Sequence, residues 1–221
     1  MGSNYEKQVF AAREIFLKYD QRIMTERFPI KSDEKYLYLK FLGTDYRVCR
    51  ENGEIEEQKE EGYVPCLDYQ VVMALYDILC YPKGRPALSG EWRTLASLQV
   101  THSSPSADKF TAPYGKLFSG KAGALADACK RLGGRRLDVP ASADVSWEIP
   151  VFSFFPVAFR FWDGDEEFSP VITLLWDKNS LDFMHFETLY YVMNHLLERL
   201  KEVIRPIAIP GCYKEDKKHK K

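Results

Sequence analysis

The stretch FWDGDEEFSPVITLLWDKNSLDFMHFET, residues 161–188, contains most of one strand-turn-strand pattern and the start of a helix. The apolar segments 157–162 and 171–176 are separated by only eight residues. Parallel strands need a crossover of about a dozen residues or more, so this connection predicts an antiparallel hairpin. Asp163-Gly164 is typical of a turn. The stretch therefore predicts a hairpin whose turn, DGDEEFSP, carries four of its acidic residues.

Similar patterns recur along the rest of the chain. Apolar residues at helical spacing predict amphipathic helices in four places: 4–24, the residues after a capping Asp68, about 121–132, and about 182–204. Strands are expected at 36–42, 46–50, a charged edge strand from Glu54, 144–149, 157–162 and 171–176. We therefore expect an α+β fold, with antiparallel sheet elements and packed helices, in a single domain over residues 1–205.

Two segments show no clear periodicity. Residues 83–120 are rich in Gly, Ser and Pro and are interpreted as a long irregular loop, which in a compact domain is usually functional or mobile. Residues 206–221 form a charged tail, which we expect to be disordered.

Composition narrows the class of protein. The 221 residues carry 31 basic and 32 acidic side chains, so no overall field attracts nucleic acid. No run approaches the ~20 apolar residues of a membrane span, and the charged N-terminus does not resemble a signal peptide, so a cytoplasmic location without membrane partners is expected. The five cysteines contain no C-x-x-C pair and are interpreted as free thiols.

Common catalytic motifs are absent from the sequence. It contains no GxGxxG, GxxxxGK[ST], HExxH or GxSxG pattern and no EF-hand loop. Of its four histidines, His195 is expected to face away from the apolar stripe of the last helix. The absence of these motifs makes membership of the common enzyme classes less expected. It does not exclude an enzyme of an unusual class.

The acidic residues of the opening stretch divide into two groups. Asp163, Asp165 and Glu167 lie in the hairpin turn, whereas Asp177 lies at the other end of the strand, roughly 20 Å away at ~3.3 Å per residue. One metal ion cannot contact both groups. The turn residues are candidate metal ligands, with a solvated loop, or a contact with a small molecule or a partner, as the alternatives.

The junction between strand and helix is the second candidate. Asp177 and His185 are expected to meet through the short turn KNSL. Such a pair serves either to hold the helix start or to transfer a proton or bind a ligand.

Aromatic residues concentrate in the C-terminal strands. Trp92, Trp162 and Trp176, together with Asp177 and His185, are candidate ligand-binding residues in a groove between these strands and the 83–120 segment. Core packing is the alternative role for the aromatic side chains.

Several segments together resemble one family. FWDGDEEFSP, LLWDKN and MHFET, with YLYLKFLGTDYRV, VVMALYDILCY and LSGEW in the same order, are similar to the domain-of-unknown-function family 3786 over roughly residues 4–205. The resemblance implies the family's fold and a cytoplasmic protein of an anaerobic bacterium. It implies no activity, cofactor or catalytic residue.

Three hypotheses follow. The first is an accessory protein that binds a small molecule or cofactor of unknown identity in the aromatic-lined groove. The second is a divalent-metal-dependent enzyme that uses the acidic turn or the Asp177–His185 pair. The third is a module that binds a protein partner.

Overall fold

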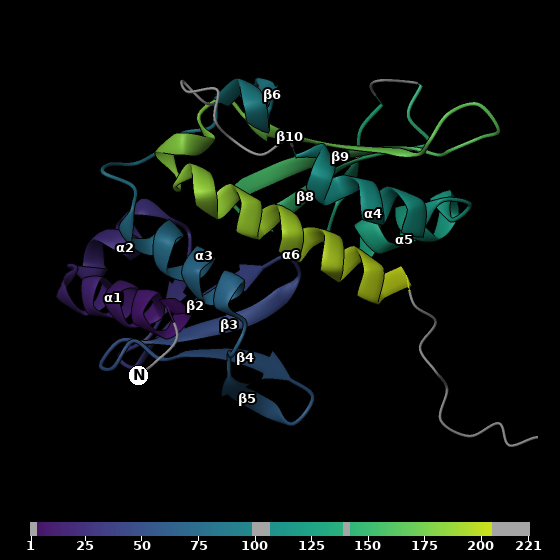
Figure 1. The fold of residues 1–221 in the computed structure, drawn as a ribbon. Coiled ribbons are helices and arrows are strands. Elements are labelled where there is room, and N and C mark those ends of the chain that lie inside the picture. Colours follow the sequence, from purple (N-terminus) through teal and green to yellow (C-terminus); the bar gives the residue numbers. More distant parts are fainter. Residues whose placement is uncertain (1–3, 99–106, 139–141, 205–221) are drawn as a thin grey trace, which may run out of the picture.

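A computed structural model of the chain describes residues 4–98, 107–138 and 142–204 (Figure 1). Within these ranges it contains two five-stranded antiparallel sheets and six α-helices, which confirms the predicted α+β fold. The predicted tail, 206–221, lies outside the described residues. No helix in the described part of the chain is long and apolar enough to span a membrane.

The N-terminal sheet has its strands in sequence order, β1 to β5. These strands are β1 (Lys31–Ser32), β2 (Tyr36–Phe41), β3 (Thr44–Cys49), β4 (Ile55–Lys59) and β5 (Gly62–Pro65). The alternating burial of β2 places Leu37, Leu39 and Phe41 in the core and its polar residues outside. This period of two is expected when one face of a sheet is covered.

The C-terminal sheet has the order β6-β10-β9-β8-β7. Its strands are β6 (Trp92–Thr94), β7 (Arg135–Arg136), β8 (Val145–Phe152), β9 (Phe155–Trp162) and β10 (Val171–Asp177). Trp162 pairs with Val171 in an antiparallel ladder, which confirms the hairpin predicted from the eight-residue connection.

The helices lie around these sheets. They are α1 (Asn4–Lys18), α2 (Gln21–Arg27), α3 (Tyr69–Cys80), α4 (Asp108–Phe118), α5 (Ala122–Arg131) and α6 (Phe186–Ile204), with the 3-10 turns η1 (Leu95–Leu98) and η2 (Ser180–Asp182). As predicted, Asp68 caps α3, because its carboxylate accepts the N–H groups of Gln70 and Val71.

Helix α6 connects the two halves of the molecule (Figure 1). It contacts α3, α4 and α5, and its apolar face, including Leu196, Leu197 and Leu200, is buried. Burying a leucine side chain contributes about 1.5–3 kcal/mol, so this face is a large part of the stability of the fold. The sheets themselves meet where the N–H of Leu42, after β2, donates to the carbonyl of Val151 in β8 (2.9 Å).

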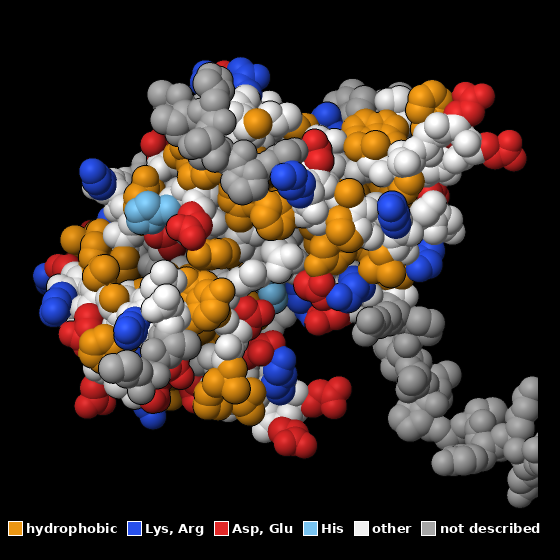
Figure 2. Space-filling model, in the orientation of Figure 1, with side chains coloured by type: hydrophobic (Ala, Val, Ile, Leu, Met, Phe, Trp, Pro, Cys, Tyr) orange, Lys and Arg blue, Asp and Glu red, His pale blue; other side chains and the backbone are white. Residues whose placement is uncertain are grey.

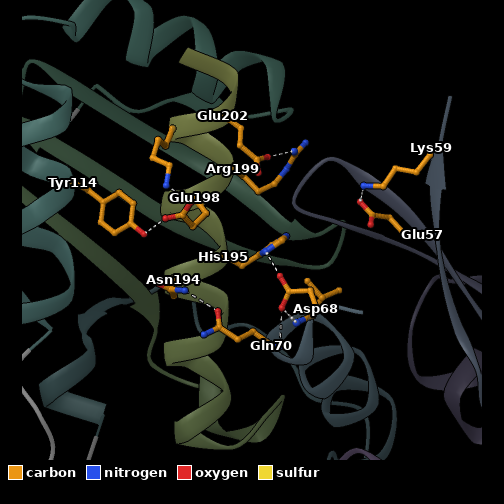
Figure 3. Close-up of polar contacts among 12 residues, drawn as sticks. Glu57, Lys59, Asp68, Gln70, Tyr114, Asn194, His195, Glu198, Arg199 and Glu202 are labelled. Carbon is orange, nitrogen blue, oxygen red and sulfur yellow. Dashed lines mark hydrogen bonds and ion pairs between the residues drawn. The ribbon is translucent and has the colours of Figure 1, made fainter. Parts of the chain in front are cut away.

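Polar residues of α6 also cross to its neighbours (Figure 3). The amide of Asn194 donates to Gln70 of α3 (2.8 Å), and Glu198 accepts a hydrogen bond from Tyr114 of α4. His195 was expected to face away from the apolar stripe, but its side chain is only 12% exposed, with its ring parallel to that of Phe41 in β2. The sequence prediction missed this because the partner surface belongs to the distant N-terminal sheet.

Two predicted segments need correction. The helix expected over residues 4–24 is divided into α1 and α2, because Asp20 accepts the N–H of Arg22 and starts a new helix. Residues 83–120 are not wholly irregular, since they include β6, η1 and α4. Helix α4 contains Pro113 and Gly115, both of which disfavour a helix in sequence-based reasoning.

Candidate functional site

A groove lies between α1, α3 and the first turns of α6, with a volume of about 670 Å³. This volume is typical of small-molecule sites, for which 300–1,000 Å³ is common. Many of its lining side chains are apolar or aromatic: Ala12, Ile15, Tyr69, Met73, Tyr76, Cys80, Tyr81 and Tyr191. We call it the helical groove. Hydrophobic side chains gather on the surface in this region of the molecule (Figure 2).

The principal polar feature of the groove is a pair formed by Asp77 and His185. One oxygen of the Asp77 carboxylate accepts the backbone N–H of His185 (2.8 Å), and the other lies 2.6 Å from its Nδ1 atom. Asp77 is 12% exposed, whereas His185 is 62% exposed. With Nδ1 held by the carboxylate, Nε2 is the ring nitrogen left to meet a ligand.

The orientation of His185 is fixed by a second contact. The ring of Tyr81, the residue directly after α3, lies 3.9 Å from the imidazole centroid. Both residues line the helical groove. The imidazole is therefore held from α3 by a carboxylate and an aromatic ring, although it stands at the start of α6.

Tyrosines form another wall of the groove. The hydroxyl of Tyr191 donates to Glu187 (2.9 Å), and the ring of Tyr191 packs edge-on against Tyr69. Tyr69 in turn donates to Gln8 of α1. Burial, followed by the hydrogen bonds with Tyr69 and Glu187, raises the pKa of Tyr191, so its hydroxyl stays protonated.

Cys80 supplies the only sulfhydryl among the residues that line the groove. Burial raises the pKa of its thiol to about 12. A thiolate is the nucleophilic form of cysteine, so at neutral pH Cys80 has the character of an apolar wall residue.

Asp177 and His185, which were expected to meet, have different hydrogen-bond partners in the structure. Asp177 is 3% exposed, and its carboxylate accepts the N–H groups of Ser89 (2.9 Å), Gly90 (2.8 Å) and Asn179 (2.8 Å), as well as the Ser89 hydroxyl. Burial acts to raise the pKa of Asp177, but these hydrogen bonds outweigh it and lower the pKa. Asp177 therefore fixes the segment that precedes β6, and His185 has Asp77 as its partner instead.

The three candidate tryptophans do not line the helical groove. Trp176 is fully buried in the core, near Phe155. Trp92 pairs with Asp177 at one end of β10, whereas Trp162 pairs with Val171 at the other end. All three lie on the C-terminal sheet, with Trp92 and Trp162 beside opposite ends of β10.

Two carboxylates of the acidic turn accept hydrogen bonds from the protein itself. Asp163 accepts hydrogen bonds from the Ser119 hydroxyl (2.8 Å) and the Gly120 N–H (2.8 Å), while Asp165 accepts the N–H groups of Glu167 and Phe168. Burial acts to raise the pKa of Asp163, but these bonds outweigh it and lower the pKa. Glu167 is exposed. Within the described ranges, no group of three or more His, Cys, Asp or Glu residues is arranged to hold a metal ion.

Sequence reasoning missed Asp77 and Tyr81 as groove residues. One signal was present, since Asp77 is the single charged residue in the otherwise largely apolar helix YQVVMALYDILC. Acidic residues are seldom buried unless they are paired, so an aspartate in this helix indicates a carboxylate with a partner elsewhere in the fold.

Fold and groove together define an α+β protein with a hollow between its helices. Residues 20–199 match the family described as Domain of unknown function (DUF3786), and the chain belongs to this family. No curated protein and no solved structure matches it.

Proposed function

We propose that this protein binds a small organic molecule with an apolar body in the helical groove. The observation that carries the proposal is a hollow of about 670 Å³ with largely apolar and aromatic walls and one fixed His–Asp pair. Ligand sites commonly combine such walls with a few oriented polar groups. The sequence-based hypothesis of an aromatic-lined site for a small molecule is retained. The proposed site now lies between the helices instead of on the C-terminal sheet.

Each lining group has a role in this proposal. Ile15 and Met73 face the apolar body from α1 and α3. The Tyr69–Tyr191 pair offers ring faces and edges to a flat group. His185, held by Asp77, offers Nε2 to a hydrogen-bonding group of the ligand.

Binding of the neutral fluorescent probe N-phenyl-1-naphthylamine tests the proposal. We expect a saturable rise in emission that Ile15→Gln and Met73→Gln each weaken by roughly 5–30-fold in Kd, the equivalent of about 1–2 kcal/mol of lost apolar contact. Phe10→Gln is the matched control, because Phe10 is also exposed on α1 (61%, against 57% for Ile15) but does not line the groove. No saturable binding, or equal weakening by Phe10→Gln, would refute the proposal.

A further inference from the structure

We infer that the ligand is an amphiphile with one anionic head, a carboxylate or a phosphate, which lies against Lys83 and Arg85. The inference rests on the proposed function, because the apolar body of the same molecule would occupy the helical groove. It adds a second subsite and a chemical class to that proposal.

The subsite is a second hollow that adjoins the first. It has a volume of about 550 Å³ and is lined by Tyr81, Lys83, Gly84, Arg85, Pro86, Ala87, Asn179, Leu181 and Asp182. Tyr81 and Lys83 line both hollows, so the two hollows adjoin at these residues and together make up one depression. An extended molecule can therefore lie in the apolar part and reach the basic part.

The charges in this depression are unbalanced at one end. Lys83 and Arg85 are exposed, and neither forms an ion pair within the described part of the chain. The one carboxylate that lines the second hollow is Asp182. The carboxylates of Asp77 and Glu187, which bind His185 and Tyr191, line the helical groove and not the second hollow. Two cations, Lys83 and Arg85, thus stand against one carboxylate among the residues that line the second hollow.

The segment that carries these cations is held in place before any ligand arrives. Pro82 and Pro86 restrict its backbone on either side of Lys83 and Arg85. The side chain of Asn179 donates to the carbonyl of Ala87 (3.0 Å), and Asp177 accepts from Ser89 and Gly90. A positioned segment loses less freedom on binding, which favours affinity. The buried Asp177 thereby contributes to the site by positioning and without touching the ligand.

The expected selectivity follows from the exposure of the two cations. Exposed ion pairs are individually weak, so charge adds to the affinity that the apolar groove provides rather than replacing it. An anionic amphiphile should bind roughly 3–10-fold more tightly than a neutral molecule of the same chain length. A cationic one should bind more weakly than the neutral molecule.

Displacement of N-phenyl-1-naphthylamine distinguishes these head groups. The competitors are decanoate, decyl phosphate, 1-decanol and decyltrimethylammonium, each below its micelle-forming concentration. We expect the two anions to compete best, and their relative strength separates a carboxylate from a phosphate ligand. In the Lys83→Met/Arg85→Gln double variant the preference for the anions over 1-decanol should disappear. Because Lys83 also lines the helical groove, the readout is the ratio of the two affinities measured in the same variant. A Lys130→Met/Arg131→Gln variant, altered at exposed cations of α5, is the matched control.

The outcomes separate this inference from the proposed function. If 1-decanol competes as well as decanoate, or if the double variant keeps the preference for anions, the anionic subsite is refuted and the apolar groove stands. If the probe itself does not bind, both are refuted. As a second variant, Asp182→Asn should increase the preference for anions, and a decrease would contradict the inference.

Discussion

The carboxylate of Asp77 holds both the backbone N–H and the imidazole of His185, which lies 108 positions later in the chain. One side chain near the end of α3 thereby caps the start of α6 and fixes the histidine at the rim of the helical groove. The stability of the fold and the proposed binding function depend on the same two residues. Mutating Asp77 and His185 one at a time separates the two roles.

Replacing Asp77 should cost more stability than replacing His185. In Asp77→Ala the N–H of His185 loses its acceptor, so we expect the free energy of unfolding to fall by about 1–3 kcal/mol. In His185→Ala that N–H keeps its partner, and a loss below about 1 kcal/mol is expected. Urea denaturation of both variants measures the difference. Equal losses would show that the backbone contact contributes nothing.

Protonation of the Asp177 carboxylate at low pH should lower the free energy of unfolding. Its pKa lies below the ordinary value of 3.8 in the folded protein, so the unfolded chain binds a proton more readily. The stability that this carboxylate contributes is therefore present above about pH 4 and is lost as the pH falls further. Asp177→Asn should be less stable at pH 7 by about 2–4 kcal/mol and should show a shallower loss of stability below pH 4. An unchanged acid slope in urea titrations would contradict this account.

His195 should destabilise the fold when it is protonated. Burial lowers its pKa, Arg199 lowers it further, and the opposing charges of Asp68, Glu202 and Glu57 do not compensate (Figure 3). Its Nε2 atom is buried and lacks a hydrogen-bond partner within the described residues.

The sign of the pH effect follows. Below its unfolded pKa of about 6.5, the unfolded chain binds the His195 proton more tightly, so stability falls as the pH drops from about 6.5. His195→Phe keeps a ring against Phe41. We expect its stability to vary less between pH 6.5 and 5 than that of the natural protein. Thermal unfolding at several pH values measures this. If the stability of the variant depended more steeply on pH than that of the natural protein, this explanation would be ruled out.

Cys80 should react slowly with alkylating reagents. Because burial raises the pKa of its thiol to about 12, only a minute fraction is thiolate at pH 8. Mass spectrometry after iodoacetamide treatment should find Cys80 largely unmodified in the time that a free thiol peptide reacts completely. Rapid modification of the folded protein would show that the groove wall opens at this point.

Mutations in the acidic turn distinguish a structural role of its carboxylates from a role in binding a metal ion. Asp163→Ala should lower the free energy of unfolding by about 1–3 kcal/mol, since Ser119 and Gly120 lose their acceptor. Glu167→Ala, at an exposed position, should change it by less than about 0.5 kcal/mol. We expect added Mg²⁺ or Mn²⁺ to leave both differences unchanged. A metal-dependent stabilisation that Asp163→Ala abolishes would restore the metal hypothesis.

The fold was predictable where local chemistry decides it. The eight-residue connection gave the antiparallel hairpin, and Asp68 gave the start of α3. Helix α4 was hidden because Pro113 and Gly115 weaken its helical pattern. Gly115 lies close to the carbonyl of Pro170, since an added Cβ atom would be 3.1 Å from that oxygen. A contact between distant segments explains this glycine, and no local pattern reveals it.

The site was less predictable than the fold. His185 was selected as a candidate from its place near the strand-to-helix junction, but its partner Asp77 comes from another helix. The groove exists only because α1, α3 and α6 meet, and such an arrangement depends on packing between faces rather than on sequence spacing. The tryptophans led to the prediction of a site on the C-terminal sheet, but Trp176 is buried in the core.

Amide chemical-shift mapping during titration with N-phenyl-1-naphthylamine tests the location of the binding site most directly. We expect the largest shifts on α1, α3 and the start of α6, around Ala12, Met73 and His185. Shifts concentrated on the C-terminal sheet around Trp92 and Trp162, with the helices unaffected, would contradict this expectation.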